Sequence, residues 1–342
     1  MVVPPEATGP LRCARLGCIV DFGEHVGAVI TGDPVVVRDE DAGGWRMFAF
    51  CLPPGHGEAL CRGDPARPGD WEPLGPLAFT NLEVAPDGIV LKPFPILDPR
   101  TPNRAARIGG QFALVVVSGV ARRALQRAWS PSLAGPWTLE PDPVLTAGGD
   151  AEVDAAHVEA PSAYWWPDGT VRYFYMATPS RAQPRPYSPL GSVQATAVQG
   201  PGDRCARKLG VVIEPPAVPG HWAAGWIGGM QLVRRHGNGW LALLNAGPHP
   251  PREDDAAISR DEPPPSLGGF AWTADPEAIG GWQLAAAPIE RIEEIPPEAM
   301  ARGEHTNLWR HHLLALPDGR RLLFYNAGPY AQERLFAKLL LD

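Results

Sequence analysis

The sequence predicts an all-β fold, a β-propeller of about five blades that occupies residues 1–342 as a single domain. Three observations predict it. Turn-forming residues are abundant along the whole chain, with 41 Pro and 38 Gly, as expected of many short strands joined by turns. A hairpin pattern recurs along the chain, and a second pattern recurs between the hairpins.

The hairpins share an apolar strand, a short turn and a second apolar or aromatic strand. In two copies the turn is Pro-Asp-Gly, at residues 167–169 and 317–319, which is a strong hairpin signal between β-rich runs. Neighbouring copies lie roughly 60 to 80 residues apart, the length of a four-stranded blade with its loops. The expected hairpins are residues 35–50, 162–177, 231–246 and 312–327, with a poorer copy at 110–118 after an irregular segment at 101–108.

The second pattern occurs at residues 128–137 and 271–282, where a strand ends in Ser or Thr and a short loop leads to Gly-Pro-Trp or Gly-Trp. We expect each to be the third strand of a blade turning into the fourth. The two ends of the chain are expected to close the ring, which leaves no sheet edge open. A generic β-sandwich is the alternative, but the matched Pro-Asp-Gly turns count against it.

Charge and composition exclude several classes of protein. The net charge of −8 argues against a nucleic-acid partner, because phosphate contacts need clustered Lys and Arg. No run of about 18 apolar residues occurs, so no transmembrane helix and no membrane partner are expected. The N-terminus lacks the basic and apolar regions of a signal peptide, and the five cysteines have no paired spacing. We therefore expect a cytoplasmic protein with free thiols.

Acidic residues precede three of the expected first strands, which line the central channel of a propeller. Asp33, Asp98 and Glu159 have similar positions relative to the hairpins of blades one, two and three, and Asp154 is close to Glu159. Carboxylates that converge on one axis repel one another and lose hydration, so at least one pKa must rise. A protonated acid beside an ionised one is what cleavage of a glycosidic bond needs. The pattern therefore predicts a site that acts on a carbohydrate.

Tryptophans could supply a platform for the sugar, because aromatic faces pack on the apolar faces of sugar rings. Trp222 and Trp226 lie in a Gly- and Ala-rich loop before blade four, and Trp165 is the third candidate. Trp165 and its neighbour Trp166 must face opposite sides of their strand, so one of them belongs to the core. Arg122 and Arg123 are expected at a solvated strand end rather than as phosphate ligands.

Four motifs match a known family: Asp33-Pro34 before the first hairpin, Gly135-Pro136-Trp137, Glu159-Ala160-Pro161, and more loosely Gly303-Glu304-His305. On these motifs the chain resembles the glycoside hydrolases of family 43 and their five-bladed relatives in families 32 and 130. The resemblance implies inverting hydrolysis of a small glycoside or oligosaccharide, with a pentose such as arabinofuranose or xylose as the sugar. The Trp-x-Asn-Asp-Pro-Asn motif of the family 32 fructosidases is absent.

The resemblance also implies residue roles. Asp33 would be the general base and Glu159 the general acid, while Asp98, or Asp154 in its place, would orient Glu159 and raise its pKa. A histidine near the axis, His305 or His311, would support water or a metal ion. No cofactor is required, although a calcium ion could bind at the axis. Two alternatives stay open: phosphorolysis, as in family 130, and a propeller that binds a sugar or serves a biosynthetic pathway without hydrolysis.

Overall fold

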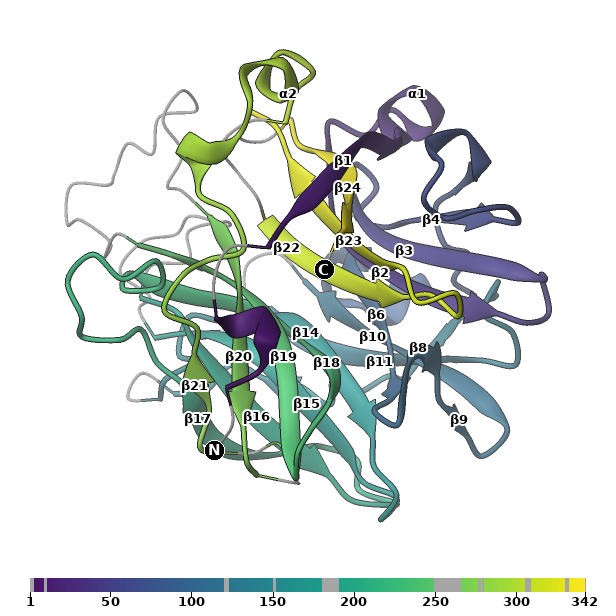
Figure 1. Cartoon of the computed structure of the whole chain (residues 1–342). Helices are drawn as coiled ribbons and strands as arrows, with labels where there is room; N and C mark the ends of the chain where they lie inside the picture. Colours follow the sequence, from purple (N-terminus) through teal and green to yellow (C-terminus); the bar gives the residue numbers. More distant parts are fainter. Residues whose placement is uncertain are drawn as a thin grey trace.

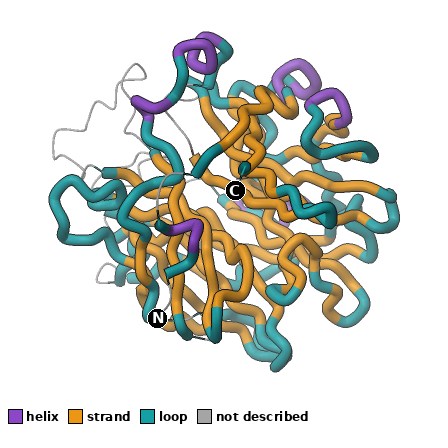
Figure 2. Tube along the Cα trace, in the orientation of Figure 1, coloured by secondary structure: helices purple, strands orange, loops and turns teal. Residues whose placement is uncertain are grey.

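The chain forms a five-bladed β-propeller, as predicted (Figure 1). The computed structural model describes residues 3–8, 11–119, 123–149, 152–179, 191–248, 266–275, 278, 280–304, 309–329 and 332–341. Strands dominate these residues (Figure 2), and none of their helices is long and apolar enough to cross a membrane. The helical segments are α1 (Phe22–Val26), α2 (Pro297–Ala301) and single 3-10 turns at Pro5–Ala7, Pro68–Asp70, Leu82–Val84, Pro86–Gly88 and Ile292–Glu294.

Each blade is an antiparallel sheet whose strands follow one another outward from the axis. Blade one contains β2 (Ile30–Asp39), β3 (Gly44–Leu52), β4 (Gly57–Cys61) and β5 (Trp71–Gly75). Blade two contains β6 (Val90–Pro95), β10 (Gln111–Ser118), β11 (Ala124–Ser130) and β12 (Thr138–Leu139), with the short strands β9 (Arg107–Ile108) and β13 (Leu145–Thr146). Blade three contains β14 (His157–Trp165), β15 (Val171–Thr178), β16 (Val193–Gln199) and β17 (Arg207–Ile213). Blade four contains β18 (Trp226–His236), β19 (Gly239–Gly247), β20 (Leu267–Thr273) and β21 (Gln283–Leu284).

Blade five closes the ring by joining the two ends of the chain. It contains β22 (Trp309–Ala315), β23 (Arg321–Ala327) and β24 (Arg334–Leu340), and its outer strand is the N-terminal β1 (Cys13–Val20). β1 pairs antiparallel with β24 from Cys13 opposite Leu340 to Val20 opposite Leu335. The expected closure is therefore confirmed, and so are four of the expected hairpins, β2–β3, β14–β15, β18–β19 and β22–β23.

Blade two differs from the expectation in its first strand. That strand is β6, which pairs with β10, and not the irregular segment at 101–108. The intervening segment forms β7 (Leu97–Asp98) and β8 (Thr101–Ala105), which extend the inner edge of blade three through β14. The apolar run of β6 is broken by Lys92-Pro93, and this break hides the strand in the sequence.

All five first strands contain a β-bulge at an equivalent place. The pairing register with the second strand shifts between Gly32 and Val35, Leu91 and Phe94, Glu159 and Ser162, Ile227 and Met230, and Trp309 and His312. In blades one to three the bulged residue has a positive φ, 49° at Asp33, 51° at Lys92 and 47° at Ala160, and a proline follows it. A positive φ is uncommon outside glycine, and bulges re-aim side chains, so these bulges set the direction of the side chains at the axis.

Aromatic contacts tie the last blade to the first. Phe324 of β23 is fully buried and meets Trp71 of β5 edge-on, with ring centroids 5.9 Å apart. Both belong to an apolar cluster that also includes Ile19 and Val20 of the closing strand β1. Ring closure therefore depends on side-chain packing between blades as well as on strand pairing.

We expect Phe324→Ala to lower the free energy of unfolding by about 3–5 kcal/mol, because it leaves a cavity between blades five and one. Urea denaturation followed by tryptophan fluorescence measures the loss. The control is Leu341→Ala at a residue that is 49% exposed, which should change stability by less than about 0.5 kcal/mol. Equal stability of the two variants would contradict the packing role of Phe324.

Candidate functional site

Four blades bring charged side chains together at the axis. Asp33 comes from β2, Lys92 from β6, Glu159 from β14 and Arg310 from β22, and Arg123 lies directly before β11. The Lys92 ammonium is 3.1 Å from Oδ2 of Asp33 and 2.7 Å from Oε1 of Glu159, and Arg123 pairs with the other oxygen of Glu159. We call these five residues the axial cluster. The structure thus brings Asp33 and Glu159 together, with a lysine between them.

The two guanidinium groups have different places in the cluster. Arg123 is buried, with 1% of its side chain exposed, and is not the solvated strand-end residue expected from the sequence. The Nη1 atom of Arg310 lies 4.0 Å from Oδ2 of Asp33, and the Arg310 guanidinium donates a hydrogen bond to the carbonyl of Pro161 in blade three. It passes over blade four at Gly229, where an added Cβ would lie 3.0 Å from the Arg310 Nε. The glycine therefore leaves the space that Arg310 occupies.

The electrostatics of the cluster keep Glu159 ionised. Burial raises the pKa of Glu159, but Arg123 and Lys92 outweigh burial and lower this pKa to about 2. For Lys92, burial lowers the pKa, and the two carboxylates outweigh it and raise this pKa above the usual value. Both groups are therefore charged at neutral pH, and neither is a ready proton donor.

The spacing of the carboxylates also bears on the chemistry. Two oxygens that contact one ammonium at 3.1 and 2.7 Å lie within about 6 Å of each other. Inverting glycosidases hold their two carboxyl groups about 6.5–9.5 Å apart to leave room for the attacking water. The oxygens of Asp33 and Glu159 are closer than this spacing, and the Lys92 ammonium lies between them.

The two candidates for the third acid lie elsewhere. Asp98 is in β7 and pairs with Arg100 at 2.7 Å. Its neighbour Leu97 is opposite Tyr164, five residues along β14 from Glu159, which is about 16 Å in a strand. Asp154 is buried, pairs with Lys208 of blade three at 2.8 Å and accepts a hydrogen bond from Tyr175. The residue that meets both carboxylates from blade two is Lys92.

The tryptophan candidates do not form an exposed platform at the cluster. Trp222 is 1% exposed and donates its indole N–H to the carbonyl of Ala285, and Trp226 is 3% exposed. Trp165 stands at the far end of β14 from Glu159, within 5.9 Å of the Arg100 guanidinium. These positions make the three side chains part of the packing of the fold.

The two histidine candidates are placed differently. His305 lies outside the described residues. His311 follows Arg310 in the β22 bulge, but it stacks on Tyr325 with ring centroids 5.7 Å apart, and burial lowers its pKa to about 3. Within blade five the described residue that reaches the cluster is Arg310.

A calcium ion at the axis stays a prediction, because the candidate His305 lies outside the described residues. The described part of the chain contains no group of three or more His, Cys, Asp or Glu side chains that could hold a metal. Calcium takes six to eight oxygen ligands, whereas Asp33 and Glu159 are both paired with cations. No step of the chemistry is therefore assigned to a metal.

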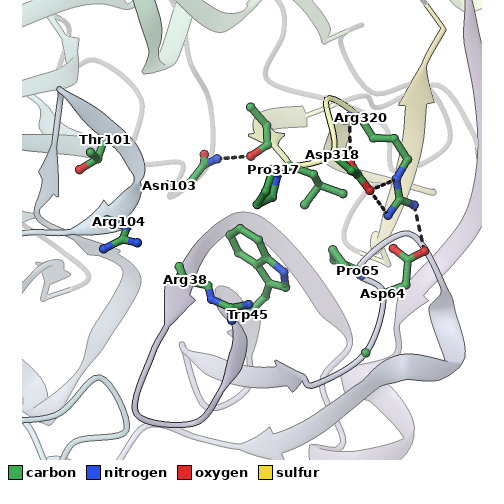
Figure 3. Close-up of a pocket in the computed structure, with 13 residues that line it drawn as sticks. Arg38, Trp45, Asp64, Pro65, Thr101, Asn103, Arg104, Pro317, Asp318 and Arg320 are labelled. Carbon is green, nitrogen blue, oxygen red and sulfur yellow. Dashed lines mark hydrogen bonds and ion pairs between the residues drawn. The ribbon is translucent and has the colours of Figure 1, made fainter.

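A pocket of about 710 Å³ lies at the other end of blade one (Figure 3). Arg38 and Trp45, at the β2–β3 turn, line it together with the β22–β23 turn around Asp318 and Arg320. Arg38 is five residues along β2 from Asp33, about 16 Å away. Asn103 of β8 also lines this pocket and donates a hydrogen bond to the carbonyl of Ala315. None of the predicted site residues lines this pocket.

Solved structures of glycoside hydrolases share this fold. No family model and no curated protein sequence matches the chain. The catalytic domain of a GH62 α-L-arabinofuranosidase from Coprinopsis cinerea matches 98% of this chain and 98% of its own at 12% identity, with a TM-score of 0.62. A thermostable family-43 glycoside hydrolase matches 92% of this chain and 89% of its own at 16% identity, with a TM-score of 0.60. The GH43_1 enzyme from Xanthomonas citri complexed with xylose matches 96% and 89% at 13% identity, with a TM-score of 0.58. At identities this low, the structural similarity shows a common fold and nothing more.

The lowered pKa of Glu159 predicts that the free energy of unfolding depends measurably on pH. Its pKa is about 2 in the folded protein against 4.5 for an ordinary glutamate, so the unfolded chain binds more protons between these pH values. The contribution of Glu159 is therefore complete above pH 4.5 and is lost as the pH falls towards 2. We expect Glu159→Gln to be destabilised at pH 7, with a difference from the wild type that shrinks on acidification.

Urea midpoints of both proteins at pH 7, 4.5 and 3 measure this effect. Glu72→Gln is the matched control, because Glu72 forms an exposed ion pair with Arg62 and such pairs contribute little. A constant difference between the wild type and Glu159→Gln at all three pH values would contradict the electrostatic assignment.

Proposed function

We propose that the axial cluster is a carbohydrate-binding site in which Asp33 and Glu159 act as ionised hydrogen-bond acceptors. The observation that carries this proposal is the bridge from Lys92 to both carboxylates. Hydrogen bonds to ionised groups are stronger than neutral ones, and sugar hydroxyls can donate to carboxylates and accept from an ammonium. The side chains of Lys92 and Asp33 are partly exposed, at 15% and 11%.

The fold relatives favour a carbohydrate as the ligand. One is the Xanthomonas citri enzyme complexed with xylose, and another is a Podospora anserina α-L-arabinofuranosidase in complex with cellotriose. The sugars named for these relatives favour a small sugar as the ligand at the axis of this propeller. Pentoses such as xylose and arabinose are among the first to test.

Hydrolysis of a pentoside is the second candidate, favoured by the meeting of Asp33 and Glu159 at one axis. General acid catalysis would need a proton on Glu159, which Lys92 and Arg123 keep ionised. Glu159 can act as a general acid only where a bound sugar moves Lys92 away from it, because the pKa of the Glu159 carboxyl then rises. The geometry therefore supports binding more strongly than cleavage.

A ligand panel separates the two candidates. We expect xylose, arabinose or their short oligosaccharides to raise the melting temperature, while nitrophenyl glycosides are cleaved no faster than by the double variant Asp33→Asn, Glu159→Gln. Turnover above that background would favour catalysis, and a sugar phosphate formed on addition of phosphate would identify phosphorolysis. Absence of any thermal shift and of any turnover would overturn the assignment of a sugar site.

Glu159→Gln gives a second test. For a binding site we expect about tenfold weaker affinity for the sugar, because one charge-assisted hydrogen bond becomes a neutral one. For a hydrolase, the rate would fall at least about a hundredfold on a substrate with a poor leaving group and far less on an activated aryl glycoside. Calorimetric titration and a comparison of the two substrates distinguish these results.

A further inference from the structure

The pocket of Figure 3 is separate from the axial cluster, and the proposed function does not use it. Its volume of about 710 Å³ is within the range of about 300–1,000 Å³ that is typical of small-molecule sites. Two of the side chains that line it, those of Arg104 and Asp318, are 57% and 51% exposed, so solvent reaches the pocket. We propose that the pocket binds a small organic anion with one carboxylate on an apolar body, and that Arg38 binds the carboxylate.

The pocket forms where segments from three blades meet. Arg38 and Trp45 belong to blade one, and the Pro-Asp-Gly turn at 317–319 belongs to blade five. The third wall is β8, which extends blade three and also contacts β2. Asn103 of β8 donates a hydrogen bond to the carbonyl of Ala315 in β22. Contacts between blades therefore hold the walls in place, and the pocket is part of the folded structure.

Most of the polar side chains that line the pocket are already paired. Arg320 contacts Asp64 at 2.9 Å and Asp318 at 2.8 Å. Arg104 pairs at 2.8 Å with Glu40, which does not line the pocket. These pairs shape the walls, but a ligand gains little from groups whose hydrogen bonds are already made.

Arg38 is the exception among the charged groups of the pocket. Within the described part of the chain, its guanidinium lies 5.3 Å from the ring centroid of Trp45 and takes part in no ion pair. The neighbouring acid Asp39 pairs with Arg46 at 2.7 Å. A contact with an aromatic ring holds a guanidinium without using its five N–H donors, and these donors form a planar fork that matches a carboxylate. Arg38 therefore offers a carboxylate donors that are already held in position.

The pocket also offers apolar surface to the rest of the ligand. Trp45, Pro65, Leu316 and Pro317 all line it. Apolar surface that is removed from water stabilises a complex by about 25 cal/mol per Å². A carboxylate that binds Arg38 places the body attached to it next to this surface, since Arg38 contacts Trp45. An aromatic acid such as benzoate has both features and is the probe that we choose.

Calorimetric titration of the wild type at low salt compares benzoate with benzamide and acetate. Benzamide has the apolar body without the charge, and acetate has the charge without the body. We expect benzoate to bind about tenfold or more tightly than either, with a preference over benzamide that falls as salt screens the charges. Equal affinity for benzoate and benzamide, or for benzoate and acetate, would overturn the assignment of the ligand. No binding of benzoate would overturn the whole inference and leave the proposed sugar site intact.

Phenyl phosphate tests the charge of the ligand. It carries about 1.5–2 negative charges at pH 7, whereas benzoate carries one. Asp64 and Asp318 share one arginine in this pocket, so this part of the wall disfavours a dianion. We expect phenyl phosphate to bind more weakly than benzoate, and tighter binding would overturn the assignment of a carboxylate.

Two variants locate the ligand. We expect Arg38→Met to weaken benzoate binding about tenfold or more and benzamide binding much less, while Arg38→Lys keeps the charge and part of the preference. Thr101→Trp, at an exposed residue of β8 that lines the pocket, fills the space and should weaken both ligands. The matched control is Arg235→Met, because Arg235 also lies over a tryptophan, 5.0 Å from the ring centroid of Trp240, and does not line the pocket. Benzoate affinity that is unchanged in Arg38→Met or in Thr101→Trp would overturn the inference.

Discussion

The bridge that Lys92 makes between Asp33 and Glu159 is the interaction on which the rest of the axis depends. Two carboxylates that are buried side by side would repel each other, and at least one would take up a proton. An ammonium within hydrogen-bond distance of both removes that pressure, and Arg123 completes the pairing of Glu159. Since these groups come from three blades, the same ion pairs also connect the blades around the axis. Removing one member would leave the others as unpaired buried charges, so site and fold stability are coupled.

The bulges explain how a repeated architecture presents different chemistry in each blade. The first strands of blades one to three place Asp33, Lys92 and Ala160 in the same backbone conformation, each before a proline. At this bulge blades one, two and five place the charged residues Asp33, Lys92 and Arg310, whereas the charged residue of blade three, Glu159, lies one position before it. Blade four contributes open space at Gly229, and blade five fills that space with Arg310.

Most of the fold could be predicted from the sequence, because hairpins with strong turns leave local signals. The meeting of Asp33 and Glu159 at the axis could be predicted as well, since each lies just ahead of a recognisable hairpin. The contribution of blade two could not, because Lys92-Pro93 interrupts β6 and because Asp98-Pro99 imitates Asp33-Pro34 in a segment that pairs with blade three. The sequence offers one signal for the axial position of Lys92, which is the alignment of Lys92-Pro93 with Asp33-Pro34.

The cationic residues were hidden for a physical reason. A buried charged residue depends on partners that are distant in sequence, 67 residues from Lys92 to Glu159 and 277 from Asp33 to Arg310 by their numbering, and no local pattern reports such a pairing. The charge that a residue brings to the axis then matters more than the architecture around it. A carboxylate at the Lys92 position would raise the pKa of Glu159 and favour proton donation, whereas the lysine lowers this pKa and favours recognition. One side chain at one bulge therefore decides whether Glu159 can hold a proton or stays an ionised hydrogen-bond acceptor.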